Sequence, residues 1–434
     1  MHLAGMKSGT KDFLNVSHVR PRFGTTQLAA ATMRGAVTLA LLLVLLPITV
    51  RPAQAQTETV LYNFGSGVNS PYSTLTSDSA GNFYGTTFYG GTGASPGSGT
   101  VFELSPNGSS WKEITRYSFC SVANCADGAG PIANVIFDGK GNLYGTTTSG
   151  GANGAGVAFE LTPRGAKWKE TVLYSFCMLS SCADGGNPGS GLVMDAAGHL
   201  YGTNSAGVFE LSKSDGAWKE QVIYGGAVGG LTMDGTGNIY GATNSTVFEL
   251  SPNGSGGLTP IVLHTFTGSP KDGSDLHSGP VLDPYGNLFG TTWSGGAGGY
   301  GGVYILVPPT QTWQKGKWPE RLVYSFPKCT PGPCNPSGIV VDLFDNIFGI
   351  LPNSGKSYGL GVVFALEYPS GKDWYKDTTL LTFDGTDGAH PNGSLFMDGA
   401  GNLYGVTAAG GTLYESTCGE GGQCGYGVVY ELTP

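Results

Sequence analysis

Residues 138–145 read Asp-Gly-Lys-Gly-Asn-Leu-Tyr-Gly, and variants of this phrase occur seven times along the 434-residue chain. Successive copies are separated by as little as 39 residues, from Asp195 to Asp234, and as much as 60 residues, from Asp78 to Asp138. Self-similarity at such a period is typical of folds built from one repeated module. The phrase therefore decides the fold class, although a motif repeated this often points to structure rather than to one asymmetric active site.

Each copy lies inside a longer unit that reads as four short strands. In the second unit, apolar runs at 135–137 and 143–147 flank the motif, so that its Gly and Asn fall where a hairpin needs a turn. A third run at 157–161 follows a Gly-rich stretch, and a fourth opens on Trp168 and extends to Phe176. Four short antiparallel strands that recur in this way predict an all-β fold, the β-propeller, with one four-stranded blade per unit.

The two ends of the repeat array complement each other. Residues 58–64 align with the fourth strand at 170–176 but follow no first three strands, whereas residues 430–434 form a third strand with no fourth. We therefore predict seven blades in one domain over 56–434, closed into a ring when the N-terminal strand completes the last blade. Closure pairs both sheet edges. An open solenoid is the alternative, and it leaves the matching ends unexplained.

The repeated side chains have structural interpretations. Asp138 and its equivalents suit the capping of a hairpin turn, and the Gly of Gly-Asn suits positive backbone dihedral angles. The aromatic residues and Trp168 suit packing between blades, with Gly145 allowing the next strand to approach closely. The Glu of Phe-Glu-Leu, which recurs around the ring, is expected to make structural bonds.

Residues 1–55 are predicted to be a signal peptide. An apolar run at 36–50 is short for a membrane span, and Ala53-Gln54-Ala55 is a cleavage site of the A-x-A type, which places cleavage before Gln56. Because 32 residues precede Met33, translation is also consistent with a start at Met33. A retained membrane anchor is the alternative. We expect a mature protein that is secreted, periplasmic or at the cell surface, with no membrane span.

Charge limits the choice of partner. Residues 1–55 hold six of the 22 basic and one of the 31 acidic side chains, which leaves 16 basic and 30 acidic groups and a net charge of about −14 in the mature chain. Such a surface repels phosphate backbones and anionic lipids, so nucleic acid is excluded as a partner. We expect a monomer that binds an extracellular glycan or protein.

The eight cysteines form close pairs in the sequence. An even number of cysteines in local pairs, in an exported chain, predicts disulfides rather than a metal site, since no histidine stands next to them. The predicted bridges are Cys120–Cys125, Cys177–Cys182, Cys329–Cys334 and Cys418–Cys424.

One face of the predicted ring carries the variable segments. Loops between second and third strands, and links between blades, share this face and contain the Gly-rich insertions and all the cysteines. Variable loops on a rigid scaffold commonly carry function. Aromatic residues that break the repeat on this face are candidates for ligand binding, and packing over the Gly-rich loops is the alternative for them: Trp293, Tyr300, Tyr358, Tyr414 and Tyr426.

Motifs for catalysis, cofactors and metals are missing from the sequence. There is no Gly-x-Ser-x-Gly elbow, no His-Glu-x-x-His and no phosphate-binding loop. Asp-Gly-x-x-Pro at Asp127, Asp184 and Asp387 is interpreted as a turn rather than a calcium loop. We predict a binding protein with no catalytic residue, cofactor or metal. The alternative is an enzyme that cleaves a polysaccharide or lactone, using channel carboxylates or His277 and His390 as acid and base.

The full unit resembles a known repeat. Asp-x-x-Gly-Asn-Leu-Tyr-Gly-Thr-Thr-x-x-Gly-Gly followed by Phe-Glu-Leu-Thr-Pro, seen at 138–163 and with departures in the other six units, is similar to the GloVer tandem repeat of bacterial choice-of-anchor proteins. The resemblance covers 57–434 and implies an exported, surface-associated protein. It implies no catalytic residues, because the motif residues are the structural ones. Those proteins often end in an anchoring tail, and the end at Thr433-Pro434 departs from that pattern.

Overall fold

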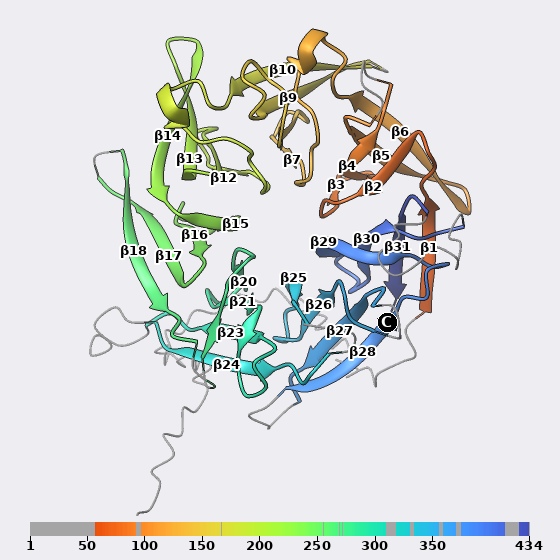
Figure 1. The fold of residues 1–434 in the computed structure, drawn as a ribbon, viewed down its shortest axis with the longest axis vertical. Helices are drawn as coiled ribbons and strands as arrows, with labels where there is room; N and C mark the ends of the chain where they lie inside the picture. The colour runs from red at the N-terminus through yellow and green to blue at the C-terminus, as the bar shows by residue number, and fades with distance from the viewer. Residues whose placement is uncertain are drawn as a thin grey trace, which may run out of the picture. The chain divides into compact units, whose positions relative to one another are not determined.

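Seven antiparallel sheets, arranged in a ring, make up the fold. The computed structural model describes residues 57–433 except 93–96, 166, 255, 269, 271, 310–317, 330–333, 356–358, 370–374 and 413–424. The first strand of each sheet faces the centre of the ring and the fourth lies at its periphery (Figure 1). This is the predicted seven-bladed β-propeller.

The blades follow one another in chain order. Blade one contains β2 (Val68–Pro71), β3 (Thr76–Ser77), β4 (Phe83–Gly90), β5 (Thr100–Asn107) and β6 (Ser110–Ser118). Blade two contains β7 (Ile136–Phe137), β8 (Leu143–Thr147), β9 (Val157–Arg164) and β10 (Lys167–Ser175). Blade three contains β11 (Val193–Met194), β12 (Leu200–Asn204), β13 (Gly207–Ser214) and β14 (Ala217–Gly225). Blade four contains β15 (Ala227–Met233), β16 (Ile239–Thr243), β17 (Thr246–Pro252) and β18 (Leu258–Thr265).

The remaining blades keep the same order. Blade five contains β20 (Val281–Leu282), β21 (Leu288–Thr292), β23 (Gly302–Leu306) and β24 (Glu320–Ser325), and blade six β25 (Ser337–Val341), β26 (Ile347–Leu351), β27 (Val362–Glu367) and β28 (Lys376–Thr382). Blade seven contains β29 (Ala389–Met397), β30 (Leu403–Ala409), β31 (Val428–Thr433) and β1 (Thr57–Asn63). A small ribbon joins β19 (Gly273–Ser274) to β22 (Ser294–Gly295), and two short 3-10 turns are η1 (Ala123–Cys125) and η2 (Ser180–Cys182).

The N-terminal strand closes the ring as predicted. β1 pairs antiparallel with β31, with Val60 opposite Tyr430 and Asn63 opposite Val428. Phe64, the residue after β1, packs edge-on against Phe102 of blade one at 5.2 Å between ring centroids. The first strand in the chain therefore completes blade seven and also ties it to blade one.

The repeated phrase forms the turn of each first hairpin. Asp138 Oδ1 accepts the backbone N–H groups of Lys140 and Asn142 at 2.8 and 2.9 Å, and Asp138 Oδ2 accepts the Asn142 side chain at 2.8 Å and the Tyr144 hydroxyl at 3.3 Å. Burial acts to raise the pKa of Asp138, but these hydrogen bonds outweigh it and lower that pKa below its ordinary value. The motif is structural, as its symmetry predicts.

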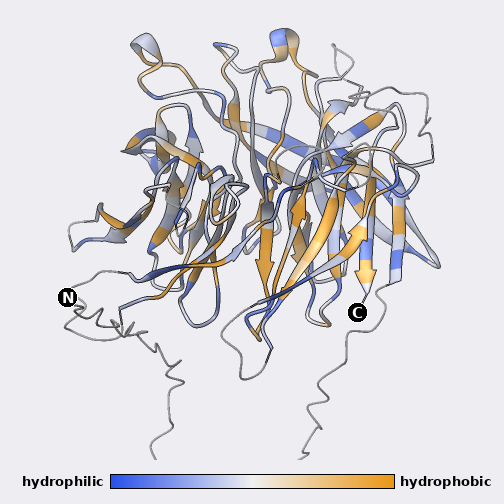
Figure 2. Ribbon diagram, turned by 60° about the horizontal axis from the view of Figure 1, so that its bottom comes forward, coloured by the Kyte–Doolittle hydropathy of each residue, from blue (hydrophilic) through white to orange (hydrophobic). Residues whose placement is uncertain are grey.

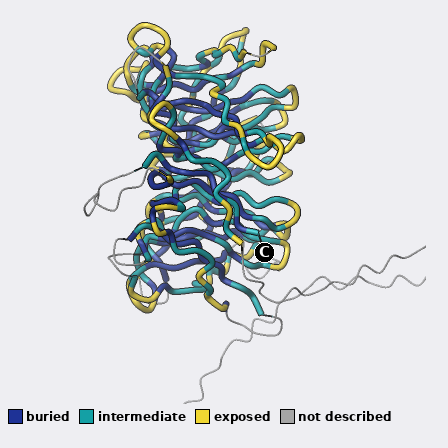
Figure 3. The backbone as a smooth tube through the Cα atoms, turned by 90° about the vertical axis from the view of Figure 1, so that its right-hand side faces the viewer, coloured by how far each residue is buried: buried dark blue, intermediate teal, exposed yellow. Residues whose placement is uncertain are grey.

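The core lies between the blades. Hydrophobic residues run along the strands with polar residues between them (Figure 2), and the exposed residues gather at the loop tips (Figure 3). Trp168 of blade two packs near Tyr84 of blade one. Both belong to one hydrophobic cluster, which also contains Val135 and Phe159 and lies between the two blades. The predicted role of Trp168 in packing between blades is confirmed.

Candidate functional site

One face of the ring carries the links between blades and the loops that join the second and third strands of each blade. On this face, blades three and four lack the long loops that the other five blades have. Only Ser205 and Ala206 separate β12 from β13, and only Asn244 and Ser245 separate β16 from β17. In blade two the same connection spans 148–156, and in blade seven it spans 410–427. One residue, Gly226, links β14 to β15. The face is therefore low over blades three and four.

An open groove of about 560 Å³ occupies this low region. Its lining comes from the link before blade three, the ends of β12 and β16, the start of β15 and the link before blade five. Among the lining residues there is no Asp, Glu, Lys or Arg, and the polar side chains are Asn187, Thr203, Asn204, Ser205, Asn244 and His277. Such a lining offers neutral hydrogen-bond donors and acceptors.

Short hydrogen bonds fix the floor of the groove. Asn204 donates to the Asp184 carbonyl at 2.8 Å and accepts the Ala206 N–H at 2.9 Å, which closes the two-residue loop after β12. Thr203 donates to the Gly229 carbonyl at 2.8 Å and so joins blade three to blade four. Because these polar atoms are satisfied within the protein, the floor is held in one conformation before any ligand arrives.

An aromatic stack stands at one side of the groove. His277, which is exposed, lies parallel to Trp293 with 3.7 Å between ring centroids and 21° between planes. The backbone N–H of Trp293 donates to the Asp275 carbonyl at 3.0 Å, and Gly273 pairs with Gly295, so the link before blade five is bound to the loop after β21. The stack presents a flat surface next to the neutral lining.

A second hollow is less distinctive. It measures about 430 Å³, lies between the turns at Asp78 and Asp138, and is lined by repeated residues that include Trp168. Because its lining belongs to the structural repeat, we take the groove over blades three and four as the candidate site.

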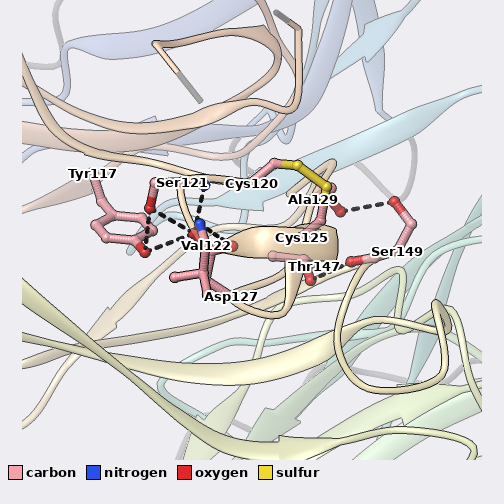
Figure 4. Close-up of a disulfide and its surroundings, with 9 residues drawn as sticks. All are labelled: Tyr117, Cys120, Ser121, Val122, Cys125, Asp127, Ala129, Thr147 and Ser149. Atoms are coloured by element: carbon pink, nitrogen blue, oxygen red, sulfur yellow. Dashed lines mark hydrogen bonds between the residues drawn. A yellow bond between two sulfur atoms is a disulfide. The ribbon is translucent and has the colours of Figure 1, made fainter. Parts of the chain in front are cut away.

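Disulfides shape the links on the same face. Cys120 bonds to Cys125 across η1, and the loop wraps the buried Asp127, whose carboxylate accepts the Tyr117 hydroxyl at 2.8 Å and the Ser121 N–H at 2.9 Å (Figure 4). Cys177–Cys182 and Cys329–Cys334 are bonded likewise. Three of the four predicted bridges are confirmed, and Cys418–Cys424 lies outside the described residues. Disulfides indicate an oxidising extracellular or periplasmic environment.

Carboxyl pairs lie where the links meet the next blade. Burial, and after it the Asp127 carboxylate, raises the pKa of Glu170 to about 7, and burial with Asp184 does the same for Glu220. In both glutamates Oε1 is buried and has no hydrogen-bond partner within the part of the chain that the structure describes. The protonated acid is therefore the favoured form of these two glutamates in the folded protein at mildly acidic pH.

Glu170→Gln tests how the raised pKa of Glu170, next to Asp127, affects the free energy of unfolding. The folded-state pKa of Glu170 is about 7 against an ordinary 4.5, so the proton it holds stabilises the fold below pH 4.5, and this contribution is lost as the pH rises through 7. The neutral Gln removes that loss. We expect the variant to be more stable than the wild type by about 1 kcal/mol at pH 8, with screening of this half-buried group allowed for, and equal to it near pH 4.5.

Urea unfolding at the two pH values measures this difference. Glu367→Gln is the control, because Glu367 is partly exposed and its Oε2 lies 3.4 Å from Lys376 Nζ, a positive charge, rather than beside another carboxylate. Wild-type and Glu170→Gln curves that keep the same separation at both pH values would contradict the assignment of the proton to Glu170.

The structure places the predicted binding residues separately. Trp293 stacks beside the groove, whereas Tyr300 packs against the core between blades five and six, and Tyr426 packs against the cluster around Phe64. Tyr358 and Tyr414 lie outside the described residues. Ligand binding by any of these five stays a prediction. The two histidines considered as acid and base lie at different blades. His277 lies in the link before blade five, and His390 lies in β29 of blade seven.

Sequence reasoning missed the groove itself. The sequence pattern predicts function on the long, variable loops. The groove instead lies over blades three and four, where the loops between the second and third strands have two residues each. The signal was present in the spacing of the repeat, because the unit from Asp195 to Asp234 is the shortest.

Along the described part of the chain, no helix has the length and apolar character needed to cross a membrane.

Comparison with known proteins agrees with the fold. The family model described as the Gloeobacter/Verrucomicrobia repeat matches residues 47–245 and 221–434. No curated protein matches the sequence.

Two solved structures illustrate the fold. A catalytically inactive virginiamycin B lyase from Staphylococcus aureus, solved with quinupristin, is similar at 14% identity and a TM-score of 0.51, over 87% of this chain and 99% of that one. The extracellular domain of a hybrid two-component system from B. thetaiotaomicron is similar at 14% identity and a TM-score of 0.51, over 87% of this chain and 41% of that one. At such identity the likeness is one of fold.

Proposed function

The chain belongs to the Gloeobacter/Verrucomicrobia repeat family, and from this premise we propose that it is an exported binding protein that recognises a neutral glycan in the groove over blades three and four. One observation carries the proposal, namely a groove lined by amides and hydroxyls, without a carboxylate or ammonium group, beside the stack of the exposed His277 on the half-buried Trp293.

Sugar chemistry fits these features. Hydroxyl groups of a neutral sugar can pair with exposed polar side chains of the groove such as Asn244 and His277, and the apolar face of a sugar ring packs on a flat aromatic surface. The net charge of about −14 that we assign to the mature chain disfavours polyanionic glycans. The absence of an Asp or Glu from the groove lining favours binding over the acid–base chemistry that glycoside cleavage requires.

Export is part of the proposal. We infer that residues 1–55 direct secretion and are removed before Gln56, since the sequence there has an apolar run and a cleavage site, and the disulfides suit an oxidising compartment. N-terminal sequencing of the secreted protein is expected to start at Gln56, and a start at or before Met33 would contradict cleavage.

Glycan arrays carrying neutral mannan, glucan and xylan oligosaccharides test the binding site. We expect wild type to retain one class, Trp293→Ala to bind it about tenfold more weakly because one stacking surface is lost, and Asn244→Trp to block the groove. Lys140→Trp is the matched control, because Lys140 is an exposed residue in the turn at the opposite face.

Three outcomes decide whether the groove binds a glycan. Weakened binding in both groove variants, with Lys140→Trp unchanged, supports the site. Equal binding by all variants places recognition elsewhere. Release of sugar products from the oligosaccharides by the wild type, without a retained complex, points to the enzymatic alternative.

A further inference from the structure

His264 replaces a tyrosine that, in two other outer strands, donates a hydrogen bond to the Asp of the following link. In β6 and β10 the equivalent positions are Tyr117 and Tyr174, and each hydroxyl donates to the Asp of the following link, at 2.8 Å to Asp127 and 2.8 Å to Asp184. In β18 this position is His264, which supplies an imidazole nitrogen, and the Asp of its link is Asp272.

Three polar atoms converge at this junction without bonding to one another. One imidazole nitrogen of His264 and one carboxylate oxygen each of Asp272 and Glu320 lie within 4.8 Å of one another. His264 Nε2, Asp272 Oδ1 and Glu320 Oε1 are buried with no hydrogen-bond partner among the described residues. His264 Nε2 is 3.6 Å from Asp272 Oδ1, which is too long for a hydrogen bond. A convergent set of unpaired buried polar atoms is costly unless something between them compensates.

The surroundings hold two of these atoms in place. Asp272 is only 8% exposed, and its other oxygen, Oδ2, accepts the Thr267 N–H at 2.8 Å and the Thr267 hydroxyl at 2.9 Å. This leaves Asp272 Oδ1 directed at the imidazole. The His264 ring lies edge-on against Phe266 at 4.6 Å between centroids. Supporting contacts of this kind orient ligands around a metal ion.

We propose that His264 Nε2, Asp272 Oδ1 and Glu320 Oε1 bind one divalent transition-metal cation, for which Zn²⁺ is the best match, and that this ion joins blade four to blade five. This proposal does not depend on glycan binding in the groove. Metal-to-ligand distances of about 2.0–2.2 Å place tetrahedral ligands roughly 3.4 Å apart, close to the separation of His264 and Asp272.

The ligand set determines the class of ion. An imidazole nitrogen suits zinc and its neighbours better than calcium or magnesium, which prefer oxygen ligands alone. A neutral imidazole and two carboxylates carry two negative charges, which one divalent cation neutralises. Three protein ligands leave a fourth position for water.

Blade four also needs the connection that the ion would supply. Its outer strand has Leu258 where β6, β10 and β14 have Trp111, Trp168 and Trp218, and Ile261 and Val262 are exposed. Asp272 and His277 belong to the same link, so an ion at Asp272 would hold the link that carries one wall of the groove.

Zinc titration of the untagged, chelator-treated mature protein tests the proposal, with Co²⁺ as a spectroscopic probe. We expect one Zn²⁺ per chain by calorimetry and elemental analysis, visible Co²⁺ absorption bands, and a higher melting temperature in Zn²⁺. His264→Tyr restores the tyrosine found at Tyr117 and Tyr174, so it should fold and bind Zn²⁺ at least roughly 100-fold more weakly. Asp272→Asn should weaken binding at least about tenfold.

His199→Asn is the matched control. His199 also lies near two carboxylates, but it bonds to Asp195 at 3.0 Å, and Asn is the residue that the repeat has at this position. We expect this variant to bind Zn²⁺ like the wild type. The proposal is overturned if the wild type binds neither Zn²⁺ nor Co²⁺, or if His264→Tyr binds Zn²⁺ as tightly as the wild type.

Discussion

A chain that begins at Gly67, and so lacks β1, is expected to lose its cooperative unfolding transition. β1 is the outer strand of blade seven, pairs with β31 over residues 57–63, and is followed by Phe64, which is 4% exposed. Its removal leaves the edge of β31 unpaired and takes away the Phe64–Phe102 contact between blades seven and one. The expected loss exceeds about 5 kcal/mol, which is a large part of the stability of a typical domain.

A circular permutant supplies the control. Thr57 and Thr433 are register partners, and the Thr433 hydroxyl lies 3.3 Å from the Thr57 carbonyl, so a short Gly-Ser linker can join the two ends. The permutant also begins at Gly67 but carries residues 57–66 after Thr433. We expect it to unfold cooperatively near the wild-type melting temperature, as measured by calorimetry and circular dichroism. A truncated chain as stable as the permutant would show that ring closure contributes little.

Gly145→Ala is expected to cost about 2–3 kcal/mol of unfolding free energy. A Cβ at Gly145 would lie 2.6 Å from Phe159 Cζ and 3.1 Å from Val135 Cγ1, inside a cluster where Phe159 and Val135 are fully buried. A well-packed core resists even one added methyl group, because neighbours must leave their rotamers. The same aromatic-over-glycine contact recurs in other blades, for example at Gly85 with Phe102.

Chemical unfolding of two further variants makes this test specific. Gly139→Ala is the control, since a Cβ there meets nothing within 4 Å, and its cost should stay below about 0.5 kcal/mol. Adding Phe159→Leu to Gly145→Ala should recover part of the loss, because the shorter side chain vacates the space that the methyl group needs. A Gly145→Ala protein as stable as Gly139→Ala would exclude steric contact as the reason for the repeated glycine.

The asymmetry of the ring explains where function is expected. Six of the seven turns that begin at Asp78, Asp138 and their equivalents have the same Asn-to-Asp hydrogen bond, and the seventh, with His199 in place of Asn, keeps a contact to Asp195. The groove and the His264 junction both lie at blade four, the unit whose outer strand departs most from the repeat. In a symmetric scaffold, a site for one ligand or ion is expected where one blade differs from the others.

The sequence by itself determined the scaffold of this protein. The blade count, the closure of β1 on β31, the capped turn at Asp138 and the three described disulfides follow from local patterns, because alternation, turn residues and cysteine spacing act over a few residues. Only the tertiary structure decided the sites. The groove depends on the relative height of neighbouring loops, and His264, Asp272 and Glu320 come from different blades and a link. No short-range pattern encodes that convergence, since it arises from how adjacent blades pack around the ring.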